Sequence, residues 1–115
     1  MRIWKVIFGL LLVTGLAFSG EETILKGEIL DLSCYLKVGA KGPDHQQCAL
    51  TCLKNGSPMG LLTEEGEIYL LLEDLKKKDG YTTAKESAAE TVEIKGQLAE
   101  RNGLKALVVN TCSKI

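Results

Sequence analysis

Five short apolar runs, separated by turn-forming or charged segments, constrain the fold of this chain more than any other feature. Each run has the length and the β-branched or aliphatic content of a strand. Gly27 lies inside the first run, where it permits a bulge or a sharp bend. The runs are 23–32, 59–63, 67–72, 91–99 and 104–111. The sequence therefore predicts a mainly β protein with five strands.

A helix is predicted over 43–54, between the first and second strands. Pro43 suits the first turn of a helix, and Asp44 complements the positive end of the helix dipole. Asn55-Gly56 is a matching stop signal. This assignment leaves 33–41 as a loop.

A second, shorter helix is predicted over 84–89, between the third and fourth strands. Thr83 and Glu86 have the spacing of a capping box, and alanines follow them. The resulting order is strand, helix-bearing loop, hairpin, short helix, hairpin. In under 100 residues, this order predicts a small five-stranded Greek-key barrel of the OB type. OB domains usually bind ligands beside the connection between their first two strands, which here carries the longer predicted helix, and beside the one between strands 4 and 5.

The first 19 residues have the composition of a secretory signal peptide. Arg2 and Lys5 precede an uncharged, mostly apolar run, and Ala17 and Ser19 are the small residues that a signal peptidase requires. Cleavage before residue 20 leaves 20–115 as one domain, which we expect in the periplasm or outside the cell. The apolar run is shorter than the roughly 20 residues of a membrane-spanning helix, so we expect no stable membrane span after cleavage.

Charge and aromatic content argue against a nucleic-acid partner. The chain carries 14 basic and 15 acidic residues, and the predicted mature part keeps 12 of the basic ones and all the acidic ones. A mildly acidic domain has no electrostatic reason to bind nucleic acid or an anionic membrane. Its aromatic side chains, three tyrosines, lack the basic groove that accompanies base stacking in single-strand binders.

All four cysteines lie in the predicted mature part. An even number of cysteines in a small exported chain usually indicates a disulfide framework. We expect Cys34 to bond to Cys48 or Cys52, with Cys112 taking the other. Each bridge would add about 2–4 kcal/mol of stability. His45 would then be an ordinary imidazole.

The alternative is a metal site. On a helix, His45, Cys48 and Cys52 are related as i, i+3 and i+7, so they share one stripe. Cys34 would complete a Cys3His set suited to Zn(II) or, with fewer ligands, to Cu(I). However, His45 and Cys52 lie roughly 10 Å apart along the helix axis, so one ion would not easily reach both. The spacing therefore favours disulfides over metal. Asp31 is expected to cap a turn, or else to orient His45.

Four short patterns resemble a group of small, exported bacterial OB-fold-like proteins of unknown function. They are G-E-I-L-D-L-x-C at 27–34, H-x-x-C-A-x-x-C at 45–52, G-x-P-x-G at 56–60 and V-x-I-x-G at 92–96. The resemblance covers about 24–110. It implies the barrel fold and no established activity or cofactor.

The residues do not predict an enzyme. A thioredoxin-type C-x-x-C pair is missing, and no Ser/His/Asp set can be assembled around the single histidine. We expect a non-enzymatic accessory or interaction module of the cell envelope, stabilised by disulfides and docking on another envelope protein. The alternative is a periplasmic Zn- or Cu-binding protein that uses Cys34, His45, Cys48 and Cys52.

Overall fold

One long strand, β1 (Glu22–Asp31), organises the fold by pairing with two neighbours in the computed structural model, which describes residues 22–115. Its first part pairs with β4 (Thr91–Arg101) and its last part with β2 (Met59–Thr63). Gly27 belongs to both ladders, and a Cβ atom there would overlap the backbone carbonyl of Leu62. A glycine is thus required where β1 passes from one partner to the other.

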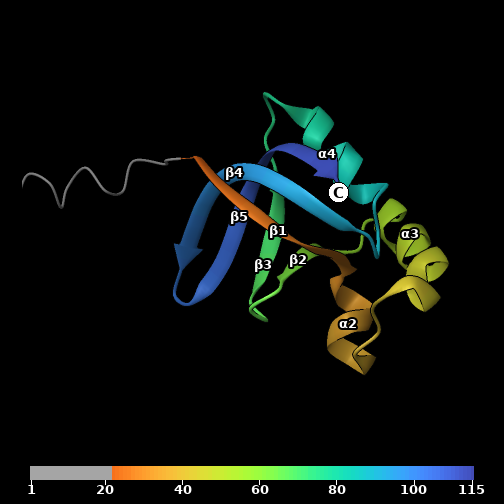
Figure 1. The fold of residues 1–115 in the computed structure, drawn as a ribbon. Helices are drawn as coiled ribbons and strands as arrows, with labels where there is room; N and C mark the ends of the chain where they lie inside the picture. Colours follow the sequence, from red (N-terminus) through yellow and green to blue (C-terminus); the bar gives the residue numbers. More distant parts are fainter. Residues whose placement is uncertain (1–21) are drawn as a thin grey trace, which may run out of the picture.

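The remaining strands close the sheet into a barrel. β2 forms a hairpin with β3 (Ile68–Glu73), which runs parallel to β5 (Leu104–Lys114). β5 in turn forms a long hairpin with β4, so the strand order is β1-β2-β3-β5-β4 and the barrel is closed. The predicted five-stranded, OB-like barrel is confirmed (Figure 1).

The helix predicted over 43–54 is present in two parts. A 3-10 turn, η1 (Pro43–His45), leads directly into α3 (Gln46–Lys54). Ala49 and Leu53 of α3 are buried and belong to the apolar core of the barrel. Because Cys48 and Cys52 each precede one of these residues, they lie about 100° around the helix from the core-facing stripe.

The prediction of a loop over 33–41 is wrong, because most of this segment belongs to the helix α2 (Leu32–Val38). Figure 1 shows α2 and α3 side by side at the end of the barrel where β1 finishes. This arrangement brings one face of α3 toward α2, and it positions the candidate site.

The helix predicted over 84–89 is also wrong in its position. The structure has α4 (Lys78–Lys85) instead, and Ala89 adopts a left-handed backbone conformation with φ 63°. Gly80 allows α4 to lie close on β5, since a Cβ atom there would come within 2.8 Å of the Asn110 carbonyl oxygen. Packing on the barrel, rather than the capping pattern, thus sets where this helix begins and ends.

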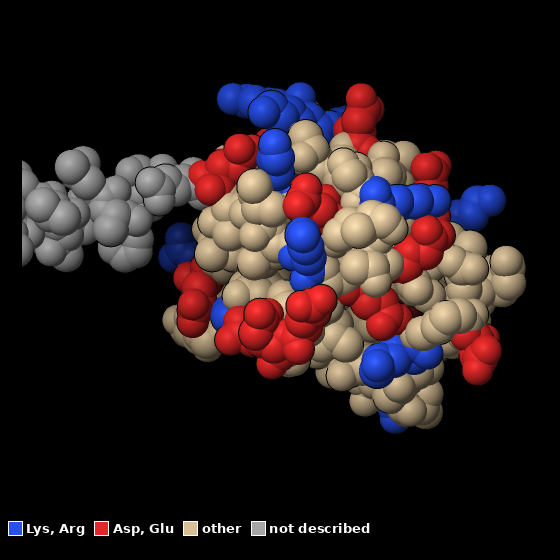
Figure 2. Space-filling model, viewed as in Figure 1, with Lys and Arg blue, Asp and Glu red and all other residues tan. Residues whose placement is uncertain are grey.

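The signal peptide predicted over 1–19 and its cleavage before residue 20 lie outside the described residues. Within 22–115, no helix combines the length and the apolar character needed to cross a membrane. On the face of the molecule shown in Figure 2, acidic and basic side chains are interspersed.

Candidate metal centre

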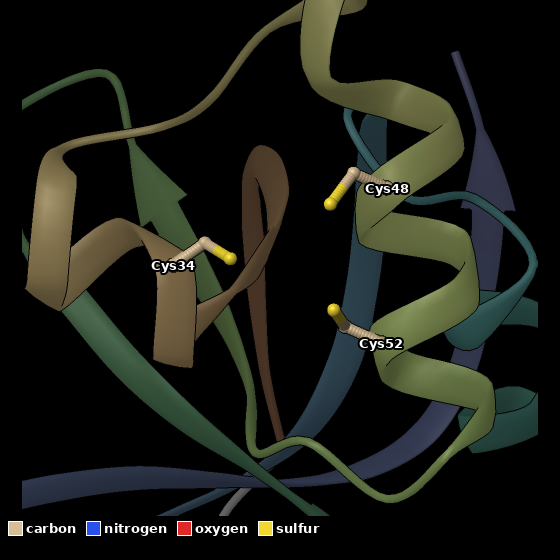
Figure 3. A group of neighbouring side chains, drawn as sticks. All are labelled: Cys34, Cys48 and Cys52. Atoms are coloured by element: carbon tan, nitrogen blue, oxygen red, sulfur yellow. The ribbon is translucent and has the colours of Figure 1, made fainter.

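Three cysteines from two different helices meet at the end of the barrel. Cys34 lies on α2, and Cys48 and Cys52 lie on successive turns of α3. Their sulfur atoms all lie within 4.8 Å of one another, and Figure 3 shows the three side chains pointing toward a common centre. Cys48 is exposed, while Cys34 and Cys52 are half-buried. The thiol triad, Cys34, Cys48 and Cys52, is therefore open to solvent on one side.

The junction between β1 and α2 fixes the position of Cys34. Asp31, the last residue of β1, caps α2 by accepting a hydrogen bond from the Ser33 N–H at 3.0 Å. At the other end, Gly39 has a φ of 72° and its N–H donates to the Tyr35 carbonyl, which ends the helix. Cys34 thus lies in the first turn of a short helix that is defined at both ends.

A second triad shares Cys34 with the first. A carboxylate oxygen of Asp31, the Cys34 sulfur and a ring nitrogen of His45 also lie within 4.8 Å of one another. The Asp31 side chain is fully buried, and its Oδ2 atom lies 3.9 Å from His45 Nε2. Neither of these two buried atoms has a hydrogen-bond partner. The distance between them is too long for a hydrogen bond.

Asp31 is held as a carboxylate by the groups around it. Burial raises the pKa of the Asp31 carboxyl, but four donors lower it by a larger amount. The Ser57 hydroxyl lowers it most, followed by the Cys34 thiol, the Ser33 N–H and the Cys52 thiol. The bonds from Ser57 and Ser33 both end on Oδ1. The pKa of Asp31 therefore lies below its ordinary value, and the group is ionised at neutral pH.

Two thiols of the triad carry raised pKa values. The hydrogen bond to Asp31, together with burial, raises the pKa of Cys34. Burial, followed by the hydrogen bond to Asp31, raises the pKa of Cys52 to about 11. Both groups are thiols at neutral pH in the metal-free protein, so they are poor nucleophiles. A bound metal ion would have to displace their protons.

The structure divides the predicted Cys3His set into two overlapping triads. His45 lies in η1, before the first turn of α3, and its ring reaches Cys34 and Asp31. Among residues 22–115, no group of four ligand atoms that contains His45 together with Cys48 and Cys52 lies within the same 4.8 Å spacing. The separation expected along the helix axis between His45 and Cys52 accounts for this division.

All four cysteines are free in the structure, so the predicted disulfides among them stay a prediction. Cys112 lies on β5 opposite Ile94, which pairs in turn with Leu25 at the start of β1. Asp31 is six residues further along β1, and the intervening strand spans about 20 Å. Cys112 is half-buried and packs against the apolar core, and it belongs to neither triad.

Ser57 belongs to the site, although the sequence favoured a helix stop and a turn over a binding loop at this position. Its hydroxyl donates to Asp31 Oδ1 and lies 2.9 Å from the Ser33 hydroxyl. The G-x-P-x-G pattern around it was the one available signal, and the pattern alone does not place Ser57 beside Asp31. Asp31 caps α2, as expected, whereas its Oδ2 atom faces His45 Nε2 at 3.9 Å without a hydrogen bond that would orient the ring.

Comparison of this chain with known protein families, with curated proteins and with solved structures finds no match.

Proposed function

We propose that this protein binds a thiophilic metal ion through the thiolates of Cys34, Cys48 and Cys52. The observation that carries the proposal is the meeting of three free sulfur atoms, from two helices, within 4.8 Å of one another. Zn(II) and Cu(I) are the biological ions that such a soft ligand set favours.

The spacing of the sulfurs supports an ion better than a disulfide. With metal–sulfur bonds of about 2.3 Å, two sulfurs on one tetrahedral ion lie roughly 3.8 Å apart. Small side-chain rotations would bring the triad to that spacing. A disulfide, by contrast, requires a separation of about 2.05 Å and would leave the third thiol unused.

The exposure of Cys48 supports a role in carrying or exchanging the ion. Structural zinc sites are closed, with four protein ligands, whereas the thiol triad leaves a coordination position free and one ligand in contact with solvent. The barrel also has its own apolar core, to which α3 contributes Ala49 and Leu53. A bound ion is therefore not required to hold the barrel together.

The envelope partner expected from the sequence fits this proposal as the donor or acceptor of the ion. Leu36 and Val38 on α2 are 75% and 77% exposed, two and four residues from Cys34. Exposed apolar side chains beside an accessible ligand support a docking surface for such a partner. With the predicted signal peptide, the proposal describes a metal-handling protein of the periplasm or cell exterior.

Competition titration tests the proposal. The reduced protein, expressed from its full sequence, is titrated anaerobically with Zn(II) and with Cu(I) against a chromophoric chelator. Removing one of three thiolate ligands should weaken binding by at least about 100-fold, more than the loss of a supporting hydrogen bond. We therefore expect this weakening of metal binding for Cys48→Ser and an unchanged affinity for Cys112→Ser. Equal affinities for wild type and Cys48→Ser would contradict the proposal.

A further inference from the structure

We propose that Asp31, Cys34 and His45 hold a second metal ion, so that the Cys34 thiolate bridges two ions. This inference rests on the proposed function, because it takes Cys34 as a ligand of the first ion. It assigns to the protein a two-metal centre in place of the single Cys3His ion that the sequence suggested.

Two buried polar atoms without partners are the first support. The Asp31 side chain is 0% exposed and the His45 side chain 16%, yet neither Asp31 Oδ2 nor His45 Nε2 has a hydrogen-bond partner. Buried polar groups in proteins are nearly always paired. An ion between these two atoms would satisfy both at once.

The distance between the two atoms is the second support. Asp31 Oδ2 and His45 Nε2 lie 3.9 Å apart. Oxygen and nitrogen ligands bound to one tetrahedral ion at about 2.0–2.1 Å lie roughly 3.3 Å from each other. The Cys34 sulfur lies within 4.8 Å of a carboxylate oxygen of Asp31 and of a ring nitrogen of His45, and it supplies the third ligand. The three atoms thus surround a space that a small ion would fill after minor side-chain movement.

The position of Cys34 explains why the two ions would share a ligand. Cys34 is the one residue that belongs to both triads. A thiolate sulfur carries several lone pairs and can bind two ions at once. Figure 3 shows its sulfur directed toward Cys48 and Cys52. The same sulfur also lies within 4.8 Å of ligand atoms of Asp31 and His45.

Charge balance favours two divalent ions. Three thiolates and the Asp31 carboxylate bring four negative charges to a partly buried site, and His45 is the one basic ion-pair partner of Asp31 within 22–115. One divalent ion would leave two of these charges uncompensated, which is costly away from bulk water. Two divalent ions neutralise all four. A carboxylate and an imidazole suit Zn(II) better than Cu(I), so the second ion is a divalent ion of the zinc class.

Titration with Co(II), as a spectroscopic substitute for Zn(II), tests the inference. The reduced full-length protein is titrated anaerobically, and bound cobalt is counted by equilibrium dialysis and elemental analysis. We expect two ions for wild type and for Cys112→Ser. His45→Gln should bind one ion and keep the ultraviolet charge-transfer band of thiolate-bound cobalt. Far-UV circular dichroism checks that each variant is folded.

The outcomes separate this inference from the proposed function. One ion in both wild type and His45→Gln would overturn the second site and leave the thiol triad intact. Loss of all cobalt from a folded His45→Gln would show a single ion that needs His45, which also overturns the bridged centre. No binding in wild type would overturn both proposals.

A measurement on wild type alone keeps the test independent of any variant. Two Co(II) ions joined by a thiolate couple magnetically. The paramagnetic resonance signal per cobalt should therefore decrease as the second equivalent of Co(II) is added. An unchanged signal per cobalt with two ions bound would mean that the ions are separate, and would overturn the bridge.

Discussion

Asp31 is the residue on which the site depends most. One of its carboxylate oxygens caps α2 and accepts the Ser57 hydroxyl, while the other faces His45. The same side chain therefore fixes the helix that carries Cys34 and the loop that leads into β2. Because Asp31 is buried and ionised, each of its donors contributes to the stability of this corner.

Ser57→Ala should destabilise the metal-free protein by about 1.5–3 kcal/mol at pH 7, since a hydrogen bond to a buried carboxylate is lost. The folded pKa of Asp31 is depressed, so this contribution is present above the unfolded pKa of about 3.9 and is lost as the pH falls through the folded pKa. Urea unfolding at pH 7 and below pH 3 measures the difference. The exposed Ser113→Ala is the control, and equal destabilisation by both variants would contradict the role given to Ser57.

Raising the pH should destabilise the metal-free protein. The folded pKa values of Cys52 and Cys112 are raised to about 11 by burial. Their contribution to stability is thus fully present below the unfolded thiol pKa of about 8.5 and is lost as the pH rises toward 11. We expect Cys52→Ser and Cys112→Ser each to show a smaller decline in unfolding free energy between pH 8.5 and 11. Declines as steep as that of wild type in both variants would refute this.

At the scale of the elements, the sequence predicted the strands well because their signals are local. Apolar alternation and turn glycines mark the two hairpins, and Pro43 and Gly56 bound the segment that contains α3. The helix α2 was missed although its caps, Asp31 and Gly39, were visible. It has only 7 residues, and such a short helix depends on tertiary contacts.

The part of the site that depends on local spacing was also predictable from the sequence. The spacing along one helix predicted that Cys48 and Cys52 share a face and that Cys34 closes over it. Two other contacts depend on how α2, η1 and the turn before β2 meet. They are the hydrogen bond between Asp31 and Ser57 and the approach of His45 to Cys34. These contacts join residues 11 or more positions apart, and no local pattern encodes them.

Gly27→Ala should destabilise the barrel by about 1–3 kcal/mol or more. The added Cβ atom would overlap the Leu62 carbonyl and push β1 away from β2. The exposed neighbour Lys26→Ala should change stability by less than about 0.5 kcal/mol. Thermal or urea unfolding of the two variants measures this contrast. Equal stabilities would mean that Gly27 is not needed at the crossing between the two ladders.

For the whole molecule, the apolar core of the barrel and the proposed metal centre are separate in space. The core is formed by side chains of the strands, α3 and α4, while the thiols lie between α2 and α3 at one end. The fold is therefore expected to survive loss of the ion, and the ion to add stability by binding the folded state alone. Such behaviour would distinguish the protein from small domains that unfold without their metal.

Chelation should leave the far-UV circular dichroism spectrum unchanged and lower the melting temperature. At a free ion concentration 100 times the dissociation constant, binding to the folded state adds about 2.7 kcal/mol. For a domain of this size, that corresponds to a shift of roughly 10 °C or more. Melting curves with and without chelator measure it. Unfolding of the protein on chelation would contradict the separation of barrel and metal centre.

The most direct test is the mass of the protein as cells make it, measured natively and after denaturation with thiol alkylation. We expect bound metal under native conditions, at least one ion per chain, and four alkylated cysteines once the protein is denatured. The same spectra show whether residues 1–19 have been removed. A metal-free protein that is four hydrogens lighter than the reduced chain and resists alkylation would rule out metal binding by these thiols, because the sulfurs would be held in two disulfides.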